Sequence, residues 1–264
     1  IDKLGRSRFV AFVGPSGSGK SSVVRAGVVP RLRKDGAFVA TMIPGARPFE
    51  ELERALLRVS PRTDPPLMAQ LTASEQGIVR AVRGILPPSA QMLLVIDQFE
   101  ELFTLVAEES TRVHFLESLR AAVGDAHSRI RVVVTLRADF YDRPLAYRNF
   151  GELVQVGTET ILPLSLEELV EAITGPAERK GVTFEPGLVA EMANDVSDQP
   201  GALPLLQYAL TELFDRRAGN TMTKGTYQAM GGAIGALGHR AEELYAALDG
   251  PGRVATRQLF LRLV

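Results

Sequence analysis

The chain contains no cysteine and no tryptophan, and only three of its 264 residues are histidine. Without cysteine it has no disulfide, no thiolate for a metal and no cysteine nucleophile, which suits a reducing cytoplasm. The histidines, His114, His127 and His239, are too scattered for a metal site or a catalytic triad. We expect them to have solvated or packing roles.

Long apolar runs and blocks of like charge are also missing. No stretch reaches the roughly 18 apolar residues that span a bilayer, and residues 1–6 have no signal-peptide core. Lysine and arginine number 30 against 31 aspartate and glutamate, a net charge of −1. We therefore expect a cytoplasmic protein whose partners include neither nucleic acid nor a membrane.

A phosphate-binding loop is the clearest motif that is present. The pattern G-x-x-x-x-G-K-[ST] is met near the start of the chain, between a β-rich run and a helical pattern. Its glycines let backbone N–H groups approach phosphates, while Lys20 supplies positive charge and the Ser21 hydroxyl can bind Mg²⁺. The following helix N-terminus favours an anion. The predicted nucleotide-binding residues are Gly14, Pro15, Ser16, Gly17, Ser18, Gly19, Lys20, Ser21 and Ser22.

A second signature begins where four apolar residues, 93–96, run into Asp97. A carboxylate at the end of a buried strand, behind a P-loop, is typical of a Walker B motif in which Asp97 holds the metal through water. Gln98 occupies the next position, where many P-loop ATPases have a catalytic glutamate, and an amide cannot accept the proton. Glu100 or Glu101 must then polarise the attacking water, and we favour Glu100. Alternatively, both only favour the N-terminus of a following helix.

Two further signals concern nucleotide sensing. Arg137 follows a β-rich run, where its guanidinium can detect a γ-phosphate. Arg143 is a less favoured alternative, and either arginine could simply be a solvated surface residue. Pro204 begins a helical pattern, an ordinary place for proline, but its ring could also pack on adenine.

The order of elements predicts an α/β domain followed by helices. We expect strands at 7–13, 37–43, 91–96 and 130–135, a short fifth strand at 153–156, and a loop at 61–66. Predicted helices between them span 20–33, 49–59, 67–85 and 111–123. From about residue 164 the pattern is all helical, opening with a capping box at Ser165–Glu168. Later helices are predicted at 186–195, 203–216, 224–230 and 233–248.

With these signals in order, the sequence resembles the STAND class of signal-transduction ATPases, relatives of the NACHT and NB-ARC switches. It looks most like the bacterial branch often found beside WD-repeat domains. The resemblance rests on residues 12–22, 44–48, 95–103, 136–141, 201–206 and 227–232. Arg137 matches the sensor arginine, Glu100 and Glu101 the paired acids, and Pro204 the proline of a Gly-x-Pro motif. Here, however, Ala202 stands where that glycine is expected.

The resemblance implies a three-layer αβα parallel sheet of the additional-strand type over residues 1–163 and a helical subdomain over 164–250. Residues 251–264 would begin a truncated winged helix, and both ends of the sequence look cut. Such proteins exchange ADP for ATP with Mg²⁺, hydrolyse ATP slowly and can form homo-oligomers. They act with flanking sensor and effector domains. The alternatives are a nucleotide-binding scaffold without turnover and, less favoured, a small-molecule P-loop kinase.

Overall fold

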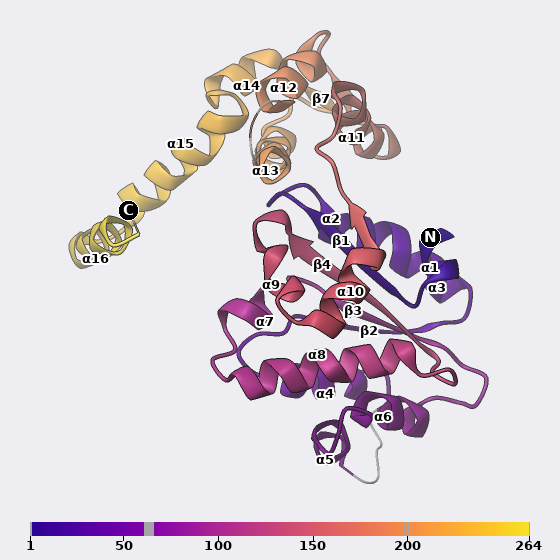
Figure 1. Ribbon diagram of the computed structural model, residues 1–264. Coiled ribbons are helices and arrows are strands. Elements are labelled where there is room, and N and C mark those ends of the chain that lie inside the picture. The colour runs from indigo at the N-terminus through magenta and orange to yellow at the C-terminus, as the bar shows by residue number, and fades with distance from the viewer. Residues whose placement is uncertain (1, 61–65, 198, 200, 264) are drawn as a thin grey trace. The chain divides into compact units, whose positions relative to one another are not determined.

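Five runs rich in β-branched and aromatic residues form one parallel sheet (Figure 1). They are β1 (Phe9–Gly14), β2 (Phe38–Met42), β3 (Met92–Ile96), β4 (Ile130–Arg137) and β5 (Thr158–Thr160). The order is β2-β3-β4-β1-β5, so β4 lies between the P-loop strand and the strand that leads to Asp97. This arrangement confirms the predicted α/β fold with its additional strand.

The computed structural model describes residues 2–60, 66–197, 199 and 201–263. Apart from Pro66, the predicted loop at 61–66 lies outside the described residues. The chain divides into two compact units between Leu162 and Pro163. Among the described helices, none is both long and apolar enough to cross a lipid bilayer.

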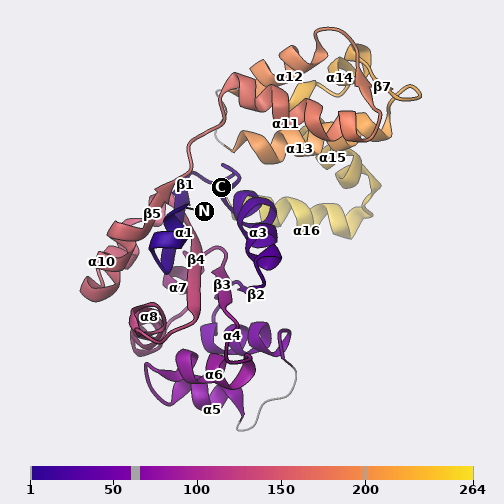
Figure 2. The same cartoon turned by 90° about the vertical axis from the view of Figure 1, so that its right-hand side faces the viewer.

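Both faces of the sheet are buried. Along β1, Phe9, Ala11 and Val13 pack into one core, whereas Val10 and Phe12 pack into another. This alternation follows from the two-residue period of a strand, and it explains why β3 is apolar throughout. Figure 2 shows α3 on one side of the strands and α8 and α10 on the other, as a three-layer fold requires.

Helices supply the outer layers of the first unit. They are α1 (Asp2–Arg6), α2 (Lys20–Ser22), the π-helix η1 (Val23–Val28), α3 (Val29–Lys34), α4 (Pro48–Leu57), α5 (Leu67–Thr72), α6 (Gly77–Ile85), α7 (Glu101–Thr104), α8 (Glu109–Gly124), the 3₁₀-helix η2 (Ala138–Phe140), α9 (Asp142–Leu145) and α10 (Arg148–Gly157). The helical segment predicted from residue 20 widens into a π-helix before Pro30, because the proline ring crowds the carbonyl four residues earlier.

Two predicted elements differ from those found. The helix expected over 67–85 is two helices, α5 and α6. Gly77 follows the break, where a Cβ would clash with the backbone oxygens of Gln70 and Leu71. The strand expected at 153–156 is part of α10. Phe150 and Val154, four residues apart, are both buried on the core, so helical spacing prevails over the local β preference of valine.

The second unit has its own core, formed mainly by residues of five helices, with Tyr227 among its most deeply buried side chains. Its elements are α11 (Leu166–Arg179), β6 (Thr183–Phe184), α12 (Leu188–Ser197), α13 (Ala202–Asp215), β7 (Thr221–Met222), α14 (Lys224–Ala229), α15 (Gly232–Ala247) and α16 (Gly250–Leu261). The predicted capping box at Ser165 and Glu168 is confirmed. The all-helical expectation is wrong in one detail, since β6 and β7 pair in parallel.

Candidate nucleotide site

The P-loop leaves β1 at Gly14 and enters the helix at Lys20. Gly17 and Gly19 have φ angles of 73° and 85°, a left-handed conformation that glycine adopts without steric cost. The Ser18 hydroxyl is buried and has no hydrogen-bond partner among the described residues. A curled backbone, an unpaired hydroxyl and the free N–H groups of a helix start suit a phosphate group.

Lys20 points back into this loop. Its side chain is buried, with 8% exposed, and its Nζ donates hydrogen bonds to the carbonyls of Gly14, at 2.9 Å, and of Pro15. Burial lowers the pKa of the lysine, and the negative charge of Glu100 opposes that shift. A phosphate oxygen would satisfy this ammonium better than neutral carbonyls do, because it brings a compensating charge.

Asp97 is the centre of the polar contacts beyond the loop. It follows β3, is 2% exposed, and accepts hydrogen bonds from Ser21 Oγ and Thr135 Oγ1, each at 2.6 Å. Arg25 Nη2 lies 2.7 Å from its other oxygen. Burial would raise the pKa of Asp97, but the two hydroxyl hydrogen bonds and the arginine outweigh it and hold the pKa below its usual value.

The oxygen atoms of Ser21 and Asp97 suit Mg²⁺, which prefers hydroxyl, carboxylate and phosphate ligands and keeps several waters. No group of three or more His, Asp or Glu side chains gathers as a metal site within the part of the chain that the structure describes. The phosphates and water would therefore complete the coordination. When bound, Mg²⁺ supplies positive charge that offsets the charge on the transferred phosphoryl group.

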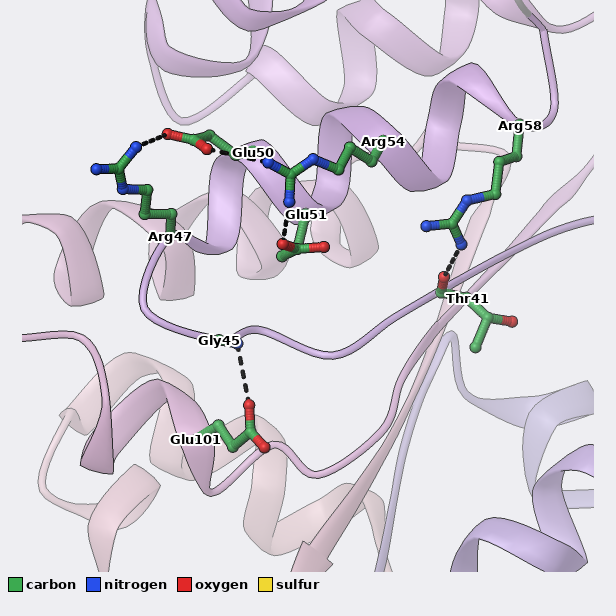
Figure 3. A network of polar contacts seen from close by, with 8 residues as sticks. All are labelled: Thr41, Gly45, Arg47, Glu50, Glu51, Arg54, Arg58 and Glu101. Carbon is green, nitrogen blue, oxygen red and sulfur yellow. Dashed lines mark hydrogen bonds and ion pairs between the residues drawn. The ribbon is translucent and has the colours of Figure 1, made fainter.

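The two candidate bases have different surroundings. Glu100 is half-buried and accepts a hydrogen bond from the Arg137 N–H at 3.3 Å. Burial raises its pKa, and backbone hydrogen bonds and the charge of Lys20 offset this only in part. Glu101 instead accepts from the Gly45 N–H at 3.2 Å, holding the segment that follows β2 (Figure 3). Its contact with the Arg137 backbone and the charge of Lys20 nearby favour Glu100 over Glu101 as the candidate base.

Gln98 has a φ of 54°, and among the described residues it is the one non-glycine residue with a positive φ. Its N–H donates to Asp97 Oδ1, at 3.2 Å, and to Thr135 Oγ1, at 2.9 Å. Its side chain is exposed. Gln98 therefore contributes through its backbone N–H, which helps to hold the Asp97 carboxylate in place.

Arg137 ends β4, next to Glu100. Its guanidinium pairs with Asp139, Nη2 to Oδ2 at 2.6 Å, and lies over the Phe140 ring, 5.3 Å from the centroid. The alternative, Arg143, is exposed in α9 and lies 3.9 Å from a carboxylate oxygen of Asp142. Arg137 therefore sits at the same sheet edge as Asp97, although an acidic partner now holds its charge.

Pro204 lies in the second unit, in the first turn of α13, and is exposed. Gly201 caps that helix with a φ of 72°.

Two residues that sequence reasoning did not single out, Thr135 and Arg25, contact Asp97 directly. Arg25 could have been found from its spacing, because residues four apart share a helix face and Ser21 was already assigned.

The whole chain, residues 1–264, matches the protein family described as Novel STAND NTPase 1. No curated protein sequence matches it.

Solved structures with a similar fold include a Walker-type ATPase of Pyrococcus abyssi, 13% identical with a TM-score of 0.60, which matches over 99% of this chain and 72% of its own. Aeropyrum pernix ORC1, solved in complex with DNA, is 16% identical with a TM-score of 0.58, over 96% of this chain and 65% of its own. Drosophila ORC bound to DNA is 18% identical with a TM-score of 0.55, over 92% and 58%. The chain thus spans less than two thirds of either ORC protein, and these likenesses concern the fold.

Proposed function

Since this chain belongs to the Novel STAND NTPase 1 family, and so is a nucleotide-binding P-loop NTPase, we propose that it is a switch module that binds ADP at rest and ATP with Mg²⁺ when active. The observation that carries the proposal is the set of side chains on neighbouring strand ends. Lys20 follows β1, Asp97 and Glu100 follow β3, and Arg137 ends β4. Parallel strands bring their carboxyl ends to one edge, where α/β folds bind nucleotides.

Each residue has a distinct part in this proposal. The P-loop backbone, Lys20 and Ser21 bind the phosphates, and Asp97 holds the Mg²⁺. Glu100 orients and deprotonates the attacking water, and Arg137 exchanges its pairing with Asp139 for the γ-phosphate. Pro204 is kept in the proposal as the residue whose ring packs on the adenine.

Hydrolysis by a single chain is expected to be slow. Gln98 takes the place of a catalytic glutamate, and an arginine from a second subunit can raise such rates by ~10³–10⁵. We therefore include in the proposal a homo-oligomer in the ATP state, acting in the cytoplasm with flanking sensor and effector domains, a WD-repeat sensor among them. The residues 251–264 would begin the winged helix of that larger protein.

Release and identification of bound nucleotide is the first test. Protein is purified without added nucleotide and denatured, and the supernatant is analysed by chromatography. About one ADP per chain supports a resting switch. If the wild-type protein is empty and binds neither ADP nor ATP by calorimetry, the proposal fails.

Lys20→Ala gives the matching mutational test. We expect it to weaken ADP binding by about 100-fold or more, because a buried charge that faces the phosphates is lost. Lys34→Ala is the control, since Lys34 is exposed on α3 and its side chain has no hydrogen bond or ion pair with other described residues. Equal ADP affinity in the two variants would contradict the assignment of the site.

A scaffold that binds nucleotide without turnover is the second candidate, favoured by Gln98 and by the pairing of Arg137 with Asp139. ATP and ADP would then both raise the melting temperature, with no phosphate released at any protein concentration. Phosphate release that grows faster than in proportion to protein concentration would instead support the switch and its assembly.

A further inference from the structure

The two oxygens of Asp97 have unequal surroundings. Oδ1 accepts hydrogen bonds from Ser21 Oγ, Thr135 Oγ1 and the Gln98 N–H. Oδ2 accepts from Arg25 Nη2, at 2.7 Å. The neutral donors thus gather on one oxygen, and a cation takes the other. Because the Asp97 side chain is 3% exposed, its charge needs a cationic partner, and Arg25 supplies it.

Arg25 reaches this carboxylate from the outside. Its side chain is 61% exposed, and it lies on η1, four residues after Ser21 and on the same helix face. A long, solvated side chain can leave its partner without breaking any packing. The contact is therefore asymmetric. Three hydrogen bonds to Oδ1 hold Asp97 in place, whereas the exposed Arg25 side chain can rotate into water.

We propose that Arg25 occupies the cation position at Asp97 whenever Mg²⁺ is absent, and that an incoming metal must displace it. The proposal rests on the proposed nucleotide site and concerns how that site tolerates the loss of its metal. With Arg25 in place, Asp97 is neutralised, and nucleotide phosphates can enter without repulsion from a bare carboxylate. With Mg²⁺ in place, the guanidinium meets a second cation and turns to solvent.

The consequence is a lowered dependence of nucleotide binding on Mg²⁺. In the wild type, Arg25 stabilises the metal-free complex and competes with the metal-bound one. Removing Arg25 weakens ADP binding without metal and strengthens ADP binding with Mg²⁺. The ratio of the ADP Kd in EDTA to the ADP Kd in Mg²⁺ must therefore rise. Because the bond lost is a hydrogen bond between two charged groups, Arg25 and Asp97, we expect this ratio to change about tenfold.

The test measures ADP binding by calorimetry in EDTA and in excess Mg²⁺, for the wild type and for Arg25→Ala. Arg25→Gln is made as well, because it keeps most of the side chain and protects the test against a folding defect. Arg31→Ala is the matched control, since Arg31 is exposed on α3 and pairs with no other described residue. We expect the ratio to rise about tenfold in both Arg25 variants and to stay unchanged in the control.

A double variant identifies the partner. In an Asp97→Asn background the carboxylate charge is gone, so adding Arg25→Ala must leave the ratio within about twofold. The same change in both backgrounds would overturn the proposal, because Arg25 would then act on the nucleotide rather than on Asp97. An unchanged ratio in Arg25→Ala and Arg25→Gln would overturn it directly.

Mg²⁺ alone provides a readout that needs no nucleotide. The Arg25→Ala protein has a bare carboxylate, so Mg²⁺ without nucleotide should raise its melting temperature more than it raises that of the wild type. Equal shifts would overturn the inference while leaving the nucleotide site standing. The effect of Lys20→Ala on ADP binding tests the nucleotide site separately, because Lys20 has no part in the exchange between Arg25 and Mg²⁺.

Discussion

The two units use buried polar groups in different ways. In the first, Lys20 follows β1, Asp97 and Glu100 follow β3, and β4 lies between these strands; the Ser18 hydroxyl has no partner among the described residues. In the second, the Tyr227 hydroxyl donates to Asp195 at 2.8 Å and accepts from the Ala233 N–H at 2.9 Å.

The second network is therefore complete without a ligand, whereas the first is not. A satisfied polar network fixes one arrangement of helices, as Tyr227 does by joining α12, α14 and α15. In the first unit the Ser18 hydroxyl has no partner among the described residues and the Lys20 ammonium faces neutral carbonyl oxygens, so a phosphate would satisfy both groups better. The polar groups of the P-loop therefore suit a ligand, whereas those around Tyr227 hold three helices together.

Among these substitutions, we expect the largest effect from a change to the candidate base of the first unit. Glu100→Gln should lower the rate of ATP hydrolysis by about 10²–10⁴, because an amide cannot take the proton of the attacking water. ADP affinity should change little. The measurement is phosphate release in single turnover, with calorimetry for ADP.

Glu101→Gln is the matched control for that experiment. Its carboxylate accepts from the Gly45 N–H, and an amide oxygen can still accept this hydrogen bond, so a smaller loss of rate is expected (Figure 3). If Glu101→Gln were the slower of the two, the assignment of the base would have to be exchanged.

Tyr227→Phe tests the closed network of the second unit. The change removes the hydroxyl and leaves Asp195 and the Ala233 N–H without a partner, which should lower the free energy of unfolding by about 1–3 kcal/mol. Urea denaturation measures the loss. ADP affinity should be unchanged, and a tenfold weakening would show that this network serves the ligand after all.

The stability that Tyr227 contributes should also depend on pH. Burial, together with the hydrogen bond to Asp195, raises the pKa of its phenol above the usual value of 10.0. The folded state thus holds the proton more tightly than the unfolded state. The contribution is complete below pH 10 and is lost as the pH rises toward the folded value. Denaturation curves of the wild type and Tyr227→Phe should therefore converge above pH 10, and a constant difference would contradict the sign.

Gln98→Gly, in the turn after β3, has the smallest expected effect on the free energy of unfolding. Both units place glycine at left-handed helix caps, Gly19 in the first and Gly201 and Gly231 in the second, whereas the turn after β3 has Gln98 at a φ of 54°. Glycine removes a strain of roughly 1–2 kcal/mol but costs about 0.5–1 kcal/mol of chain entropy. We expect a net gain of about 0.5–1 kcal/mol in unfolding free energy. Gln98→Ala, which keeps the Cβ, should show no gain.

Local patterns predicted most of the first unit because its three central strands, β1, β3 and β4, are buried on both faces and flanked by clear turns. The run 93–96 reads as a strand in isolation, and β3 covers it. The pattern failed at 153–156, where two valines suggested a strand. Only packing of Phe150 and Val154 against the sheet determines that this segment is a helix.

The sequence by itself determined the P-loop motif, the family and the four main strands of the sheet, because these depend on neighbouring residues. The tertiary structure decided which side chains hold the Asp97 carboxylate, Thr135 and Arg25 among them. Ser21, Arg25 and Thr135 are 76, 72 and 38 residues away from it along the chain. They meet because parallel strands end at one edge and the P-loop helix starts there, so a carboxylate after β3 faces residues from three separate elements.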